Sequence, residues 1–193
     1  MPRIGRNEAE QKLIDRKIQS LWHSASHCHF NRDFRFNSQS TAMQFSRRKS
    51  LGGRAWLSIK LPTPEHEKAL VLWGNSSLGM LLYWWFANKQ HSGRGSIGKS
   101  ALQDLIVLNV LQLTSEQLDA AGRVFDAFAC LTLLPLHRIN QDENRRQLDQ
   151  ALMCEVLGIS VDLHHSDGAM ELLRFKLSRE PSILGHKKPV GTS

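Results

Sequence analysis

Residues 65–110 constrain the fold more than any other stretch of the chain, because a long apolar segment there runs into a loop rich in glycine and cations. The apolar segment covers about residues 65–90, with acidic residues first and Asn88-Lys89-Gln90 last, the charge order that a helix macrodipole favours. The run Leu105-Ile106-Val107-Leu108 predicts a short buried strand within residues 102–111. We therefore expect a long apolar helix, then a cationic loop, then a strand.

The remaining sequence predicts more helices than strands. Apolar residues at helical spacing predict an amphipathic helix over residues 7–22, and the capping box Thr114-Ser115-Glu116-Gln117 predicts the start of another helix. Alternating apolar residues predict a strand over residues 54–61, whereas residues 24–53 show no clear period. The fold class expected is α+β, a mainly helical single domain with a small sheet.

The expected organisation has three parts within one globular domain. Residues 1–53 combine the N-terminal amphipathic helix with a basic irregular segment, residues 54–180 form an α+β core, and residues 181–193 form a mobile C-terminal tail. A chain of 193 residues with 41% hydrophobic residues can bury one core of reasonable size.

Charge is distributed unevenly along the chain. Residues 1–100 carry 16 Lys and Arg against 6 Asp and Glu, while the remaining residues carry 9 against 12. This asymmetry predicts a positive face that would attract nucleic acid, an acidic protein or an anionic membrane surface. A basic protein with no anionic partner is the alternative.

Cysteine usage and hydropathy favour a cytoplasmic protein. The three cysteines are widely spaced without a CxxC pair, which does not indicate a disulfide framework. The N-terminus is too charged for a secretory signal, and glycines interrupt the longest apolar stretch, so we expect no membrane association.

Residues 93–100 match the phosphate-loop pattern G-x-x-x-x-G-K-[ST]. That mechanism needs a buried strand before the first glycine and a helix that opens at the lysine. The expected order here is the reverse, with a helix before the loop and a strand after it. A P-loop nucleotide-binding protein is therefore the least favoured alternative, and a strand-to-helix turn at residues 93–100 would restore it.

Other chemical sites lack the required residues. His23, His27, Cys28 and His29 are too closely spaced, and lack a suitable fourth ligand, for a tetrahedral metal site. No pattern for nucleophilic or acid–base catalysis is present. We therefore expect no catalytic residue, cofactor or metal ligand.

The cationic loop can instead contact a nucleic-acid backbone. Its glycines allow close approach, while its cations and backbone N–H groups can contact phosphates. A second basic group beside glycines supports this interpretation, and polar side chains in the loop could reach base edges. The predicted DNA-binding residues are Lys89, Gln90, His91, Arg94, Ser96 and Lys99 from the loop, with Arg47, Arg48, Lys49 and Arg54 from the second group.

The order of these elements resembles the C-terminal target-recognition region of N6-adenine DNA methyltransferases of restriction–modification systems. In that family a helix of the type ALLNSxL precedes a glycine-containing loop, a strand and a helix resembling LxxEQ. The corresponding residues here lie at 69–78, 93–98, 102–110 and 113–118. The resemblance spans residues 54–130 and implies DNA recognition.

The chain also departs from that family. It lacks the Pro-Pro dipeptide of the Asn/Asp-Pro-Pro-Tyr/Phe motif that holds the flipped adenine. The resemblance therefore implies a non-catalytic module, which would be a detached part, a subunit or a remnant of such a protein. Catalysis would come from a lost upstream region, a separate methyltransferase or another large enzyme chain. An alternative is a protein-interaction subunit that docks on such an enzyme through the aromatic helix around Trp84 and Trp85.

Overall fold

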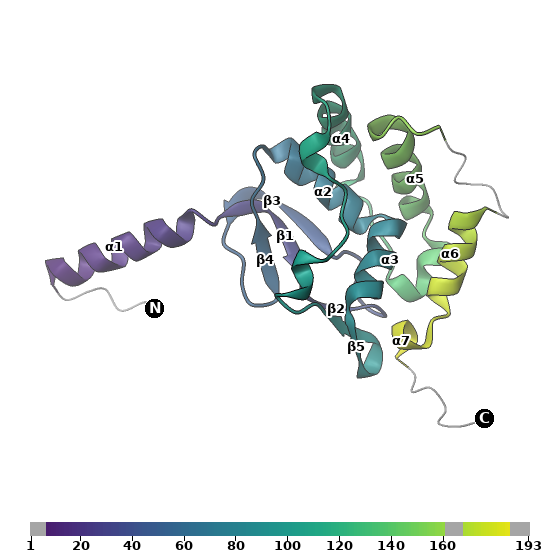
Figure 1. The fold of residues 1–193 in the computed structure, drawn as a ribbon, viewed down its shortest axis with the longest axis horizontal. Helices are drawn as coiled ribbons and strands as arrows, with labels where there is room; N and C mark the ends of the chain where they lie inside the picture. Colours follow the sequence, from purple (N-terminus) through teal and green to yellow (C-terminus); the bar gives the residue numbers. More distant parts are fainter. Residues whose placement is uncertain (1–6, 161–167, 186–193) are drawn as a thin grey trace.

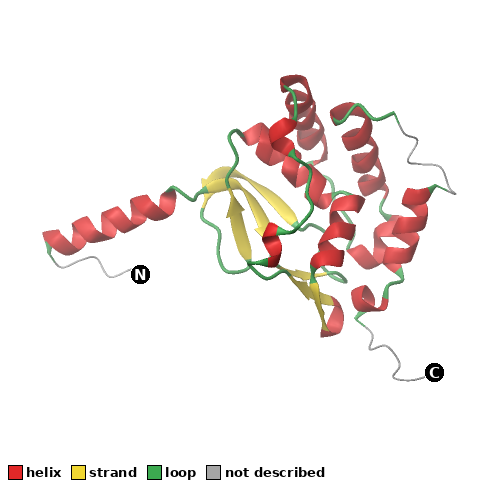
Figure 2. Cartoon of the chain, in the orientation of Figure 1, coloured by secondary structure: helices red, strands yellow, loops and turns green. Residues whose placement is uncertain are grey.

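The computed structural model describes residues 7–160 and 168–185. Two small antiparallel sheets lie beside a group of helices, and one helix projects away from this body (Figures 1 and 2). The helices are α1 (Glu8–Trp22), α2 (Pro64–Asn75), α3 (Ser77–Phe86), α4 (Ser115–Phe128), α5 (Glu143–Ala151), α6 (Ala169–Ser178) and α7 (Pro181–Leu184). The strands are β1 (Ser26–Asn31), β2 (Asp33–Arg35), β3 (Met43–Ser50), β4 (Trp56–Ile59), β5 (Asn88–Gln90) and β6 (Arg94–Ser96).

Sheet A has the strand order β3-β1-β4, and sheet B has the order β2-β6-β5. In sheet A, Phe30 pairs with Met43 on one side and with Leu57 on the other. Only Arg32 separates β1 from β2, and its backbone N–H donates to the Ala55 carbonyl at 2.7 Å. The two sheets are therefore joined where β1 ends. The predicted strand at residues 54–61 is confirmed as β4.

The long apolar helix expected at about residues 65–90 is not formed. Two helices replace it, and Ser76 between them has extended backbone angles, φ −65° and ψ 164°. The Ser76 hydroxyl accepts from the Gly79 backbone at 3.1 Å and thereby caps α3. The buried Asn75 side chain accepts from the backbones of Ala42 and Met43, at 2.9 and 3.1 Å. Polar residues thus end one helix and start the next.

Two fully buried arginines brace this break from the C-terminal helices. Arg145 donates to the Asn75 carbonyl and pairs with Asp142, while Arg174 donates to Ser77 and pairs with Asp149. Removing a partner from such a pair leaves a buried charge without compensation. The bend between α2 and α3 is therefore part of the folded core.

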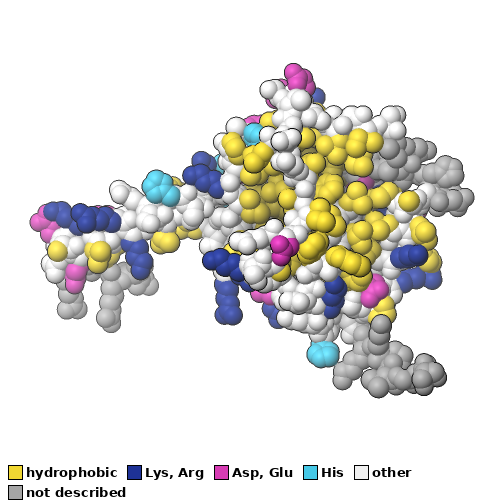
Figure 3. All heavy atoms as spheres, viewed as in Figure 1, with side chains coloured by type: hydrophobic (Ala, Val, Ile, Leu, Met, Phe, Trp, Pro, Cys, Tyr) yellow, Lys and Arg dark blue, Asp and Glu magenta, His cyan; other side chains and the backbone are white. Residues whose placement is uncertain are grey.

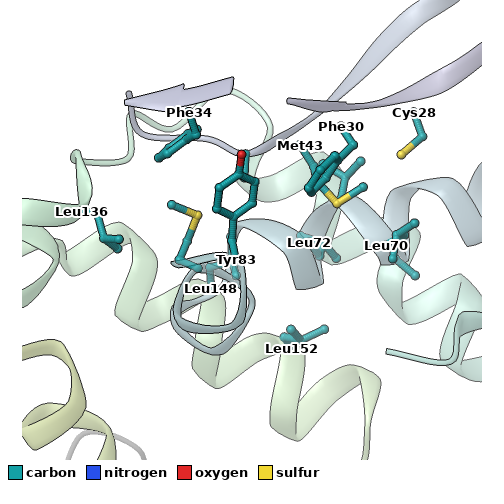
Figure 4. Close-up of a cluster of buried hydrophobic side chains, with 14 of the residues drawn as sticks. Cys28, Phe30, Phe34, Met43, Leu70, Leu72, Tyr83, Leu136, Leu148 and Leu152 are labelled. Carbon is teal, nitrogen blue, oxygen red and sulfur yellow. The ribbon is translucent and has the colours of Figure 1, made fainter. Parts of the chain in front are cut away.

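One hydrophobic core runs through both the N-terminal and the central parts of the chain. Figure 4 shows Tyr83 of α3 pointing toward the strands, between Phe34 and Phe30. Its ring centroid lies 5.4 Å from each of those two rings, and its hydroxyl donates to the Asn31 carbonyl at 2.8 Å. The same cluster extends to Ile183 of α7.

Three expectations about irregular and extended segments are wrong. Residues 24–53 were expected to be irregular or mixed in structure, but they form β1, β2 and β3. The strand expected at residues 102–111 is absent, because its backbone crosses the core without a partner strand while Leu105 and Leu108 pack against the core. We call residues 102–111 the strap. Residues 181–185 of the predicted mobile tail are ordered, since Pro181 starts α7 and Ile183 is buried; residues 186–193 lie outside the described residues.

Other predicted helices are confirmed. Asn7 caps α1, and Thr114 and Gln117 form the predicted capping box of α4. No residue of α1 is buried, although the sequence gives it an apolar face. Among the described residues, no helix combines the length and hydropathy that a membrane crossing requires.

Candidate nucleic-acid interface

Residues 88–96, which include most of the predicted cationic loop, form a β-hairpin that supplies two strands of sheet B. Its turn places Ser92 and Gly93 at φ 63° and 71°, so both have the positive φ typical of tight hairpin turns. A Cβ atom at Gly93 would lie 2.6 Å from the Ile183 carbonyl oxygen, so this position accepts only glycine. The Gly93 carbonyl accepts from the Phe36 backbone at 2.8 Å, which attaches the turn to the segment after β2.

The register of sheet B sorts its side chains into two faces. Phe34, Gly95 and Lys89 are paired across the three strands and therefore share one face. Phe34 is fully buried, and a Cβ atom at Gly95 would lie 2.6 Å from the Phe36 ring, so this face is turned toward the core.

The opposite face of sheet B carries six polar side chains in two cross-strand rows. The first row is Asp33, Ser96 and Asn88, and the second is Arg35, Arg94 and Gln90. Ser96 and Asp33 are partly exposed and the other four are exposed. We call this surface the polar face of sheet B.

Positive charges lie directly opposite each other on the polar face of sheet B. Arg35 and Arg94 are cross-strand partners, and like charges in that position destabilise a sheet. One oxygen of Asp33 lies 3.6 Å from Arg94, but both side chains are more than a third exposed. Such a pair contributes little. An anion between the two arginines would relieve their repulsion, so the arrangement is suited to phosphate.

Three of the predicted loop residues meet on this face. Gln90, Arg94 and Ser96 lie side by side, and the Gln90 amide donates to the Ser96 hydroxyl at 3.1 Å. His91 is exposed in the turn, and Lys99 is exposed three residues after β6. The hairpin therefore brings together part of the predicted set.

Lys89 lies on the other face of the hairpin. Its ammonium donates to the Trp85 carbonyl at 2.8 Å and sits 4.7 Å from the Trp84 ring centroid. Partial burial there lowers the pKa of Lys89, and Glu180 partly opposes this effect. Lys89 therefore packs against α3 and does not share the face of sheet B on which Arg94 lies.

The second predicted basic group is divided between two places. Arg54 precedes Ala55, whose carbonyl accepts from Arg32 where the two sheets join, so Arg54 lies near sheet B. Arg47, Arg48 and Lys49 lie toward the other end of sheet A, where Ser50 pairs with Ser26. With about 3.3 Å per strand residue, that end is roughly 10–15 Å farther along β1. The structure does not bring those three cations to the polar face of sheet B.

Sequence reasoning missed Arg35, Asn88 and Arg32. The guanidinium of Arg32 donates to the Ile97 carbonyl at 3.0 Å, beside the end of β6. The alternation Asp33-Phe34-Arg35-Phe36 was the available signal, because Phe34 and Phe36 are buried while Arg35 is exposed.

The phosphate-loop pattern at residues 93–100 does not form a nucleotide cradle. Strand β6 occupies the middle of the motif instead of preceding it, and the helical turn Ala101–Gln103 is only three residues long. No helix N-terminus is therefore aimed at a phosphate here.

The histidines and cysteine near residue 28 do not assemble a metal site. His27 stacks on Phe45, with 5.1 Å between the ring centroids, and His29 hydrogen-bonds Ser50 at 2.8 Å. Cys28 is buried, which raises the pKa of its thiol to about 12. Within residues 7–160 and 168–185, no group of His, Cys, Asp and Glu could hold a metal ion.

Comparison of the chain with protein-family models, with curated proteins and with solved structures gives no match.

Proposed function

We propose that this chain is a non-catalytic DNA-binding module that contacts the duplex through the polar face of sheet B. The observation that supports the proposal is the pair of cross-strand rows, with Arg35, Arg94 and Gln90 in one and Asn88 and Ser96 in the other. A small β-ribbon fits the major groove of DNA. Arginine reads the edge of guanine, and asparagine or glutamine reads the edge of adenine.

The surroundings of the face support contacts to phosphates. Lys99 follows β6, and Arg54 lies beside the junction of the two sheets. With Arg35 and Arg94, these residues could neutralise about four phosphates, so affinity should fall roughly a hundredfold between about 50 and 200 mM salt. A fluorescence-anisotropy titration of a labelled duplex at the two salt concentrations measures this. Absence of binding at the lower concentration would refute the proposal.

A pair of charge variants locates the contact. Arg35→Ala with Arg94→Ala should weaken duplex binding about ten- to a hundredfold and change the free energy of unfolding by less than about 0.5 kcal/mol. The matched control is Arg123→Ala with Arg138→Ala, which removes two exposed arginines from α4 and from residues 136–141. Equal losses in both double variants would show that only net charge matters and that sheet B is not the interface.

The resemblance to adenine methyltransferases adds a finer proposal. In it, the chain acts as a detached target-recognition part, and a separate chain supplies the adenosylmethionine site and the Pro-Pro motif. The helix break at Ser76 and the missing strand at residues 102–110 leave fewer shared elements than the sequence indicated. A neighbouring coding sequence that carries both motifs, and whose product methylates DNA only together with this chain, would support the finer proposal.

A second candidate function is docking on a larger enzyme chain, favoured by apolar side chains that the fold leaves uncovered. Trp85 of α3 is 67% exposed, and Leu172 and Phe175 of the adjacent helix α6 are also exposed. Surface patches of this kind often mark protein interfaces. Under this function, Trp85→Ser would abolish association with the neighbouring enzyme chain, whereas Arg35→Ala with Arg94→Ala would not.

A further inference from the structure

An apolar cavity of about 380 Å³ lies on the side of α2 and α3 that the strap covers. Phe30 of β1 and Ile59 of β4 contribute to its floor, and Trp73, Gly79 and Tyr83 line it at the break between the helices. Its volume falls within the range of small-molecule sites in proteins. Figure 3 shows hydrophobic side chains gathered over the centre of this face, where α2, α3 and the strap lie.

The chemistry of the lining excludes a charged ligand. No Asp, Glu, Lys, Arg or His contributes to the cavity. The Tyr83 hydroxyl is committed to the Asn31 carbonyl, and Asn109 is exposed on the strap. Water against such a lining finds few polar partners, so an apolar molecule can displace it at low cost.

The strap gives this cavity an entrance. The backbone of residues 104–109 hydrogen-bonds only within residues 101–113, as far as the described chain extends. Leu105 and Leu108 hold it to the body through apolar packing, while Ile106 and Val107 are 59% and 46% exposed yet also line the cavity. A segment held by side chains alone can open locally at low cost.

An apolar molecule gains stability in this space through burial. One side of the space is open to solvent, so its apolar walls face water there. A ligand seated against these walls removes both its own apolar surface and that of the walls from water, and it adds dispersion contacts with them.

We infer that this chain binds an uncharged apolar small molecule, such as an aliphatic or fused-ring hydrocarbon with at most one hydroxyl group, between the strap and the break at Ser76. The inference is independent of the DNA-binding proposal, because none of the residues on the polar face of sheet B lines the cavity. The inference also accounts for the apolar character of the strap, because residues 105–108 form no strand but line the cavity.

A neutral fluorescent naphthylamine, N-phenyl-1-naphthylamine, tests the inference on the full chain. We expect a saturable rise in its fluorescence with one dye per chain, reversed by dodecanol. Leu105→Trp replaces an aliphatic side chain that lines the cavity with a larger indole ring, and it should weaken dye binding by at least about tenfold. The matched control is Leu172→Trp, which enlarges an exposed leucine on α6 and should leave dye affinity unchanged.

Each alternative result has a defined meaning. No saturable rise, or equal affinity in wild type and Leu105→Trp, would overturn the inference. Dimerisation that Leu105→Trp abolishes, without bound dye in the wild type, would place a second copy in the cavity and also overturn it. If Leu105→Trp fails to fold by circular dichroism, Val107→Trp at the exposed rim provides the blocked variant, with the same expected loss.

Discussion

The two sheets have the same strand number and the same antiparallel pairing, but their central strands have different surroundings. Strand β1 of sheet A is buried along nearly its whole length, including the polar residues Ser26 and Asn31. In the central strand of sheet B, Gly95 is buried whereas Arg94 is exposed. The central strand of sheet A is therefore enclosed, whereas sheet B is anchored by one face and presents the other. A polar partner can therefore reach the central strand of sheet B but not that of sheet A.

The comparison requires that the buried face of sheet B hold the sheet to the core. Phe34→Ala removes a fully buried ring that packs against Phe36 and Tyr83, so we predict a loss of about 3–5 kcal/mol in the free energy of unfolding. Urea denaturation followed by circular dichroism measures it. The control is Phe175→Ala on α6, which is 43% exposed and should cost less than about 1.5 kcal/mol. Equal costs would mean that sheet B is not anchored by this face.

The enclosure of sheet A depends on a buried carboxylate. Glu67 of α2 accepts hydrogen bonds from the Ser26 hydroxyl, the His27 backbone and the Leu61 backbone, at 2.9, 3.1 and 3.3 Å. We predict that Glu67→Ala lowers the free energy of unfolding by about 2–3 kcal/mol, because it leaves the partly buried N–H groups of His27 and Leu61 without an acceptor, whereas the Ser26 hydroxyl keeps the Ile59 carbonyl at 2.5 Å. Glu65→Ala, two residues earlier in the same helix, should cost about 0.5 kcal/mol. Chemical denaturation of both variants decides whether the carboxylate position matters.

Burial in sheet A also predicts how stability responds to alkaline pH. The pKa of the Cys28 thiol is raised from 9.0 to about 12, chiefly by burial and secondarily by Glu67. Above pH 9 the unfolded chain loses this proton while the folded chain keeps it, so this contribution to stability is lost as pH rises from about 9 to 12. We predict that Cys28→Ala reduces the loss of stability between pH 8 and pH 10 by roughly 1 kcal/mol. Parallel thermal melts at the two pH values measure it; an unchanged loss would mean that Cys28 is accessible to solvent.

Local signals predicted much of the helical part of the fold. The capping box at Thr114 and Gln117 acts within one helical turn, so adjacent residues carry the information. The break at Ser76 is different. Asn75 accepts hydrogen bonds from Ala42 and Met43, which lie more than 30 residues earlier. The hydropathy of residues 65–90 carries no information about these distant partners.

The predictions for two extended segments, β1 and the strap, were wrong for a related reason. Strand β1 contains Ser26, His29 and Asn31, which do not indicate a buried strand until their distant partners are known. Ser26 is satisfied by Glu67, which lies 41 residues later. The prediction for the strap was wrong in the opposite direction, because an apolar run predicted a strand in a segment whose backbone pairs with no strand.

The candidate interface was predicted only in part, because some of its residues are close in the sequence and others meet only through pairing of distant strands. Gln90, Arg94 and Ser96 lie in one hairpin, so their proximity follows from the local chain. Arg35 joins them only through the pairing of β2 with β6, across 59 residues of sequence. Arg47–Lys49 looked equivalent to Arg54 in composition, but the direction of β3 carries them to the opposite end of sheet A.

The smallest predicted effect concerns the turn of sheet B. Ser92 has φ 63° and ψ 34°, and it is the only residue other than glycine with a positive φ in the described chain. The connections of sheet A contain no positive φ, so backbone strain of this kind is confined to the presenting sheet.

Ser92→Gly should stabilise the folded chain by about 0.5 kcal/mol, because relief of steric strain should exceed the added entropy of the unfolded chain. The substitution keeps the backbone carbonyl that accepts from Asn37. The control Ser100→Gly, at φ −69° and ψ −43°, should instead destabilise by about 0.5–1 kcal/mol, because there is no strain to relieve. Differential scanning calorimetry measures both shifts in Tm. If Ser92→Gly lowered the Tm as Ser100→Gly does, the turn would be unstrained, and the contrast between a relaxed scaffold and a strained presenting hairpin would be wrong.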